Sequence, residues 1–219
     1  MAKKNEMKLV SYKIEAPPFH FSLCHDLDLH NISFELLKKK KNILLNLSNA
    51  GFPVVDKINS LGIDFVGIRV IRDPRQILVS NYFHHLKDHA YESQSGWFWD
   101  KLYHDQLAMN SLSQEDGLLY ELDNITKDVL ENQIFGWRDK NRVLEIKLED
   151  FESSSLHYVN KIAEFSGMEI PDDMNLSNKR ANIDSKKWSN CFTPEIKARF
   201  KDRYGEQLIE LGYESDLNW

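Results

Sequence analysis

The chain has 219 residues, a formal net charge of −6 and 42% hydrophobic side chains. This length suits one domain with a sizeable core, and the acidic balance argues against DNA, RNA or an anionic membrane as a partner. Its two cysteines are too few for a metal cluster or a disulfide framework, and no apolar run has the length of a membrane span. The basic N-terminal segment also lacks the apolar core of a signal peptide. We therefore expect a soluble, cytoplasmic protein whose anion sites, if any, are local.

Strand and helix patterns alternate in the first third of the chain. Strand patterns occupy residues 8–14, 19–24, 42–48 and 65–71, and helical patterns occupy 32–40 and 53–61. Strands that alternate with helices are typical of a parallel sheet covered by helices. We therefore predict an α/β fold.

Helical patterns dominate the rest of the chain. The predicted elements are a helix over 74–88 that begins with Pro74, a helix over 113–135 capped by Ser113, a strand over 143–151, a helix over 154–166 that ends near Gly167, and a final helix between Thr193 and Gly212. Asp150 is interpreted as a helix cap after its strand. The segments 88–112 and 171–192 are predicted to be loops, and variable loops of this kind build substrate pockets.

The sequence VIRDPRQILVS at 70–80 places two arginines and a proline where a buried strand ends and a helix begins. Ligands of doubly wound sheets bind beyond the carboxyl ends of the strands. The first turn of a helix offers unpaired N–H groups, and an arginine adds donors suited to phosphate or carboxylate. Taken alone, the motif has two interpretations: an anion site at Arg72, or a surface turn in which Arg72, Asp73 and Arg75 pair with one another.

The longer stretch GIRVIRDPRQILVSNYFHHL resembles the segment of sulfotransferases that binds the 3′-phosphate of 3′-phosphoadenosine-5′-phosphosulfate (PAPS). The family pattern is an apolar strand, R-D-P-R-D, an apolar trio, V-S and an aromatic pair, and Gln76 stands where the family usually has Asp. Later segments resemble family segments in the same order: DGLLYEL at 116–122, VLEIKLEDF at 143–151, and WSNCFTPEIKARF with LGY within 188–213. The resemblance covers roughly residues 40–219.

The resemblance implies a P-loop-NTPase-like parallel sheet flanked by helices, with a helical C-terminal part, in a single domain over residues 1–219. It implies transfer of a sulfuryl group from PAPS to a hydroxyl or amine of a small-molecule or carbohydrate acceptor, without a metal. Arg72 and Ser80 would hold the 3′-phosphate, and Arg75 would support the turn or pair with a carboxylate such as Asp73. Two alternatives stay open: a non-catalytic binding or interaction module on the same fold, and an unrelated α/β nucleotide-binding protein.

Two further features of the family have candidates in this chain. The family's general base is commonly a histidine after a strand, and His25 in FSLCHDLD is the nearest candidate. A histidine at the edge of the core is the other interpretation of His25. A late basic loop of the family covers the 3′-phosphate, and Lys179 and Arg180 form the closest basic pair here, with the lysines at 186–187 as a second pair. A solvated basic loop is the alternative for both pairs.

Residues 1–71 lack the P-loop-like segment of the family, roughly P-K-S-G-T-T-W, whose N–H groups and lysine cradle the 5′-phosphosulfate. The first glycine is Gly51, and this region contains no Lys-Ser/Thr or Gly-Thr pair. Three explanations are open: an N-terminally incomplete chain, which we expect, a motif supplied by another chain, and loss of transfer activity. An incomplete fold would expose a sheet edge or an apolar face, so self-association is also predicted.

Overall fold

A computed structural model describes nine stretches of the chain and divides it into two compact units, Met1–Val66 and Gly67–Trp219. The described residues are 19–24, 43–48, 52–62, 64–88, 100–136, 138–139, 141–167, 170 and 187–219. Among the helices within these stretches, none combines the length and apolar character needed to cross a membrane. The single domain over residues 1–219 stays a prediction.

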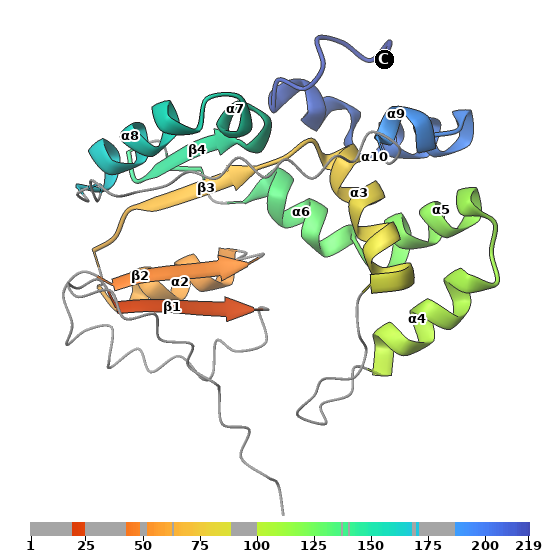
Figure 1. Cartoon of the computed structure of the whole chain (residues 1–219), viewed down its shortest axis with the longest axis horizontal. Helices are drawn as coiled ribbons and strands as arrows, with labels where there is room; N and C mark the ends of the chain where they lie inside the picture. The colour runs from red at the N-terminus through yellow and green to blue at the C-terminus, as the bar shows by residue number, and fades with distance from the viewer. Residues whose placement is uncertain are drawn as a thin grey trace, which may run out of the picture. The chain divides into compact units, whose positions relative to one another are not determined.

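The first unit contains a parallel pair of strands followed by a helix. β1 (Phe19–Cys24) pairs with β2 (Ile43–Ser48), and α2 (Phe52–Ser60) comes next (Figure 1). Parallel strands need a long connection between them, which the chain between β1 and β2 provides. The strands predicted at 19–24 and 42–48 and the helix predicted at 53–61 are therefore confirmed. The strand predicted at 8–14 and the helix predicted at 32–40 lie outside the described residues.

The second unit is built around another parallel pair, β3 (Gly67–Ile71) and β4 (Val143–Lys147). The register runs from Gly67 opposite Val143 to Ile71 opposite Lys147, so both strands end at the same edge. A helix leaves this edge from each strand: α3 (Pro74–Phe83) begins after a two-residue turn, and α7 (Leu148–Ser153) begins directly after β4 (Figure 1). The α/β class with parallel strands is thus confirmed.

The turn before α3 follows from its sequence. The Asp73 carboxylate accepts the N–H of Arg75 over 2.9 Å, and Pro74 takes the first helical position, where its missing N–H costs nothing. After Phe83 the chain continues as the π-helix η2 (His84–Asp88), so the helix predicted over 74–88 is present with a looser last part.

The remaining elements are helical: α4 (Asp100–Asn110), α5 (Gln114–Asn124), α6 (Lys127–Phe135), α8 (Ser155–Ser166), α9 (Trp188–Cys191) and α10 (Pro194–Glu210). One hydrophobic core joins the inner faces of α3, α5, α6, α9 and α10 to the end of β3. From α10 it takes Ile196, Phe200, Tyr204 and Leu208, which are spaced by one helical turn. Both α7 and α8 pack against β4 instead. The core therefore fixes α3, which carries Arg75, and with it the turn that carries Arg72.

The predicted helix ends are confirmed. Ser113 accepts the N–H of Asp116 and Thr193 accepts that of Ile196, as caps of α5 and α10. Gly167 and Gly212 both adopt a φ of 68°, a backbone conformation that residues with a side chain rarely adopt. These local signals place the last helices correctly.

The single helix predicted over 113–135 is wrong, because the chain breaks into α5 and α6. At the break, the N–H groups of Ile125 and Thr126 both bond to the carbonyl of Glu121. The buried Thr126 hydroxyl also donates to the carboxylate of Glu121 and accepts from the amide of Asn81 over 3.2 Å. A threonine that bonds locally in this way competes with continuation of the helix.

Four other predictions need correction. The strand predicted over 143–151 ends at Lys147, because residues 148–151 belong to α7. The segment predicted as a loop over 88–112 contains α4, and the loop predicted over 171–192 contains α9. Asp150 does not cap a helix, because α7 begins at Leu148 without an intervening loop and places Asp150 in its first turn. The acidic side chain there still suits the positive end of the helix dipole.

Candidate anion site at the carboxyl edge of the strands

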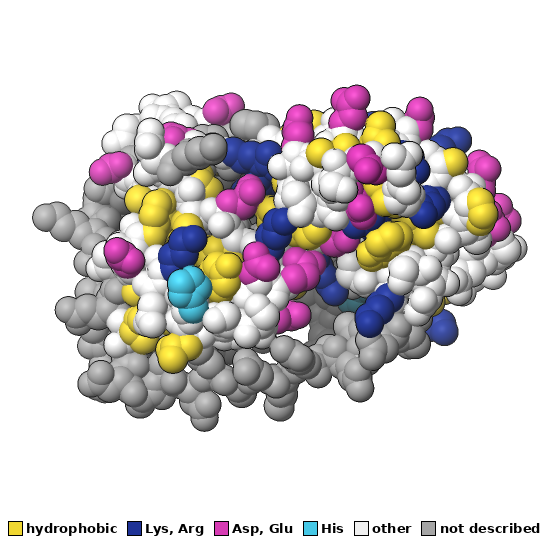
Figure 2. All heavy atoms as spheres, turned by 90° about the horizontal axis from the view of Figure 1, so that it is seen from above, with side chains coloured by type: hydrophobic (Ala, Val, Ile, Leu, Met, Phe, Trp, Pro, Cys, Tyr) yellow, Lys and Arg dark blue, Asp and Glu magenta, His cyan; other side chains and the backbone are white. Residues whose placement is uncertain are grey.

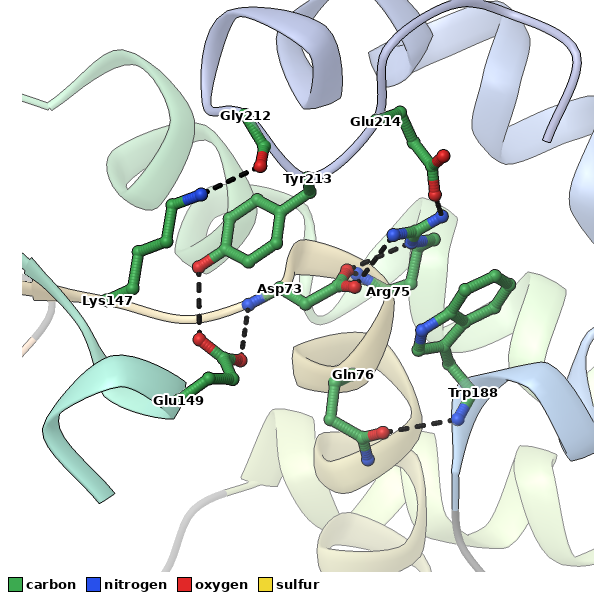
Figure 3. A network of polar contacts seen from close by, with 9 residues as sticks. All are labelled: Asp73, Arg75, Gln76, Lys147, Glu149, Trp188, Gly212, Tyr213 and Glu214. Carbon is green, nitrogen blue, oxygen red and sulfur yellow. Dashed lines mark hydrogen bonds and ion pairs between the residues drawn. The ribbon is translucent and has the colours of Figure 1, made fainter. Parts of the chain in front are cut away.

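The turn between β3 and α3 is held from both sides by side chains of other elements. The N–H of Arg72 points to the Gln133 side chain of α6 at 3.4 Å, and the N–H of Asp73 donates to Glu149 Oε1 of α7 over 3.1 Å (Figure 3). Since Ile71 faces Lys147 in the register, Arg72 follows at the level where β4 passes into α7. The turn therefore carries Arg72 at the carboxyl edge of the strand pair.

Arg75 is almost entirely buried, with 2% of its surface exposed, and it serves the fold. Its Nε and Nη2 donate to the two carboxylate oxygens of Asp73 over 3.0 and 2.8 Å, and its Nη1 pairs with Glu214 (Figure 3). The guanidinium carbon lies 3.9 Å from the ring centre of Trp188 and 4.7 Å from that of Trp219. Burial disfavours its charged form, but Asp73 and Glu214 outweigh burial and raise the pKa of Arg75. The predicted pairing of Arg75 with Asp73 is confirmed.

Arg72 has a different environment. It is half-buried, and among the described residues no carboxylate pairs with its guanidinium. Three carboxylates at this edge have other partners: Asp73 and Glu214 bind Arg75, while Glu149 accepts from the Asp73 N–H and from the Tyr213 hydroxyl. Two arginines three positions apart thus differ in what they can bind.

The C-terminal segment after α10 closes the same edge. Tyr213 donates its hydroxyl to Glu149 Oε2 over 3.3 Å, and Lys147 donates to the carbonyl oxygen of Gly212 over 2.8 Å (Figure 3). The Lys147 ammonium also lies 4.4 Å from the ring centre of Tyr213. Burial raises the pKa of Tyr213 far above its ordinary value, and the carboxylates of Glu149 and Asp73 raise it further. The Tyr213 hydroxyl therefore keeps its proton and remains a donor.

The start of α3 differs from the expectation in one respect. The N–H of Arg75 donates to the Asp73 carboxylate, and the N–H groups of Gln76 and Ile77 donate to the Asp73 carbonyl. The first turn of α3 therefore does not offer the unpaired N–H groups expected from the sequence. Positive charge at this edge comes from the side chains of Arg72 and Lys147 and from the helix dipole.

Ser80, the second predicted phosphate ligand, lies in the second turn of α3 and is half-buried. Its carbonyl oxygen accepts the N–H of His84. A helical rise of about 1.5 Å per residue puts Ser80 about 9 Å along the axis from Pro74. One large ligand could reach both Arg72 and Ser80, but no hydrogen bond joins these two described residues. The other predicted site residues, His25, Lys179 and Arg180, lie outside the described residues and stay predictions.

Sequence reasoning did not assign roles at this edge to Glu149, Tyr213 or Glu214. Glu149 had a usable signal, since it follows a buried strand and so falls at the carboxyl edge of a parallel sheet. Tyr213 had only a weak signal, because it belongs to the LGY stretch that resembles a later family segment, and Glu214 had none, because only packing brings the end of the chain back to β3. Gln76, which departs from the family pattern, accepts the N–H of Trp188 over 3.2 Å and so links α3 to α9 (Figure 3).

Charge is mixed on the face of the molecule that Figure 2 draws. Figure 2 shows Lys and Arg side chains interspersed with Asp and Glu side chains on the face turned to the viewer. An anionic ligand would therefore be selected by one locally arranged cation and less by a broad field.

Neither a comparison with protein-family models nor a search of curated proteins finds a match to this chain.

Proposed function

We propose that the chain is a sulfotransferase that binds the 3′-phosphate of PAPS at the carboxyl edge of β3 and β4, with Arg72 as the principal cation. The observation that carries this proposal is the contrast between the two arginines of the RDPR motif. The Arg75 guanidinium is paired with Asp73 and Glu214 and packs against two indole rings, whereas Arg72 has no carboxylate partner among the described residues. A guanidinium in this position suits phosphate, because its planar fork can donate two parallel hydrogen bonds to two phosphate oxygens.

In the proposed reaction, an acceptor hydroxyl or amine attacks the sulfur of PAPS in line with the bond to the 5′-phosphate. The new bond from acceptor to sulfur forms as the bond from sulfur to the phosphate oxygen breaks, and adenosine 3′,5′-bisphosphate leaves. Arg72 and Ser80 would hold the 3′-phosphate, Lys179 and Arg180 would cover it, and His25 would take the acceptor's proton. We propose in addition that the parallel strands belong to a P-loop-NTPase-like sheet flanked by helices.

A second candidate function is nucleotide binding without transfer. It is favoured by one observation, the lack of a P-loop-like pattern in residues 1–71. Transfer of a sulfuryl group needs positive charge and donors on the transferring group, as phosphoryl transfer does. A chain that binds only the 3′-phosphate end would keep affinity for the nucleotide without the chemistry.

The binding step is tested by isothermal titration with adenosine 3′,5′-bisphosphate. We expect the unaltered chain to bind it and Arg72→Ala to bind at least ~10-fold more weakly, since a charge-assisted hydrogen bond is lost. Arg199→Ala is the matched control: it removes the same charge from an exposed pair with Asp123 and should leave affinity unchanged. Equal affinity of Arg72→Ala and the unaltered chain would contradict the assignment of Arg72, and no binding by the unaltered chain would contradict the function.

The chemical step is tested separately, with PAPS and a set of phenolic, sugar and amine acceptors. Release of adenosine 3′,5′-bisphosphate that depends on an acceptor supports the sulfotransferase. Tight binding without release from any acceptor supports the second candidate.

A further inference from the structure

We propose that Tyr213 is a positioning residue of the anion site: its hydroxyl holds the carboxylate of Glu149 and so prevents this carboxylate from neutralising Arg72. The inference rests on the proposed binding of a 3′-phosphoadenosine nucleotide and adds a residue to that site. Tyr213 acts through Glu149, and it needs no contact with the ligand.

Glu149 lies next to Arg72 along the turn. Its Oε1 accepts the N–H of Asp73, one peptide unit after Arg72, and its side chain is exposed. The attraction between opposite charges near a protein surface exceeds the value in bulk water. Without a second restraint, a pair between Glu149 and Arg72 would be an internal competitor for the anion.

Tyr213 supplies that restraint from the opposite side. Its hydroxyl lies 3.3 Å from Glu149 Oε2, so the two carboxylate oxygens are held in two directions by Asp73 and Tyr213 (Figure 3). The ring is itself fixed, because Lys147 packs over it and bonds to the preceding residue, Gly212. The raised pKa of Tyr213 keeps the hydroxyl a donor throughout the range in which the protein would bind nucleotide.

Two other carboxylates at this edge are also held by a neighbouring side chain. Asp73 and Glu214 are both bound by the buried guanidinium of Arg75. Arg75 therefore withholds these two carboxylates from Arg72, and Tyr213 withholds Glu149. Residues 213 and 214 are adjacent, so one short segment after α10 contributes to both restraints.

The consequence for affinity follows from a population argument. If Glu149 pairs with Arg72 in part of the molecules, the apparent affinity for an anion falls by the fraction that remains competent. Removal of the Tyr213 hydroxyl should raise the paired fraction and weaken binding, although Arg72 itself is unchanged. Removal of the negative charge of Glu149 should then restore binding, because no competitor remains.

The experiment is a double-mutant cycle in the full chain, with titration of adenosine 3′,5′-bisphosphate as the readout. We expect Tyr213→Phe to weaken binding about 3- to 10-fold, Glu149→Gln to leave it unchanged or slightly tighter, and the double variant to return to the affinity of the unaltered chain. Tyr213→Leu also lacks the hydroxyl, so it should weaken binding as well, and combining it with Glu149→Gln should restore the affinity. Tyr120→Phe, which removes a hydroxyl that donates to Asp105 between α4 and α5, is the control and should bind normally.

Each outcome of this cycle supports or contradicts the positioning role of Tyr213. A loss in Tyr213→Phe that Glu149→Gln does not restore would mean that the hydroxyl is merely structural, and would overturn the inference. So would normal binding by Tyr213→Phe when Arg72→Ala has lost affinity, which leaves the proposed function intact. No binding by the unaltered, folded chain would overturn the proposed function and the inference together.

Discussion

At the scale of single residues, the RDPR motif shows how neighbours in sequence acquire different roles. Arg75 is a buried cation that donates to both carboxylate oxygens of Asp73 and packs against Trp188 and Trp219, which themselves meet edge to face. A guanidinium suits this place because its planar fork matches a carboxylate while its flat faces stack on aromatic rings. Removal of the cation would take the ion-pair partner from Asp73 and Glu214.

We predict that Arg75→Met lowers the free energy of unfolding by about 3 kcal/mol, the loss typical of breaking a buried ion pair. Arg75→Lys should recover only part of it, since an ammonium lacks the fork. Urea denaturation followed by circular dichroism measures both. Arg199→Ala, which breaks an exposed pair, should cost no more than about 1 kcal/mol. Equal losses at positions 75 and 199 would show that the buried network is not stabilising.

At the scale of elements, the position of α3 depends on a close approach to α5. Gly117 is buried where the two helices meet, and a Cβ added there would lie 2.8 Å from Tyr82 Cε2. Tyr82 is itself a core residue with 4% of its surface exposed, so its ring has little room to move. The two helices can pack at this distance because position 117 has no side chain.

We predict that Gly117→Ala destabilises the protein by about 1–3 kcal/mol, the range for overpacking a core. Alanine favours a helix over glycine by about 1 kcal/mol, but this gain is smaller than the cost of displacing the Tyr82 ring. Gln114→Ala, at an exposed position of the same helix, should be neutral or slightly stabilising. A stability increase in Gly117→Ala, measured by thermal unfolding, would contradict the packing described for α3 and α5.

At the scale of the whole molecule, stability is unevenly distributed in the second unit. The core cluster draws on α3, α5, α6 and α10. Among the described residues, α8 has one buried side chain, Val159, which lies outside this cluster, and α7 has none. The free energy of local opening is lowest where few apolar side chains are buried. Glu149, which lies on α7, thus belongs to a weakly anchored element, and its contacts with Asp73 and Tyr213 matter more for its position.

Hydrogen exchange followed by mass spectrometry tests this distribution. We predict that peptides from α3, α5 and α10 exchange only through global unfolding and that peptides from α7 and α8 exchange faster through local opening. Saturating adenosine 3′,5′-bisphosphate should slow exchange in α7, if binding at Arg72 is linked to the edge that holds Glu149. Uniform protection across these helices would contradict the prediction.

Local signals were sufficient for elements whose ends are stabilised by nearby residues. Pro74, Ser113 and Thr193 act within one helical turn, so the starts of α3, α5 and α10 could be predicted. The helix α4 was missed because Asp105 occupies a buried position and interrupts the apolar pattern. Its carboxylate is satisfied by Lys101 one turn earlier at 2.8 Å and by the hydroxyl of Tyr120 from α5 at 2.9 Å. A polar residue in a core position is recognisable only when its partners are known.

By itself, the sequence predicted a strand over 65–71, a turn and a helix that begins with Pro74, with Arg72 at the carboxyl edge of parallel strands. The resemblance also implied that Arg75 pairs with a carboxylate such as Asp73, whereas only the tertiary structure decided that Glu214 and two tryptophan rings also contact Arg75. Caps and turns depend on residues a few positions away, whereas the partners of Arg75 and Glu149 arrive from the far end of the chain: Trp188, Tyr213, Glu214 and Trp219. Their arrival depends on how α10 packs into the core, which no local pattern specifies.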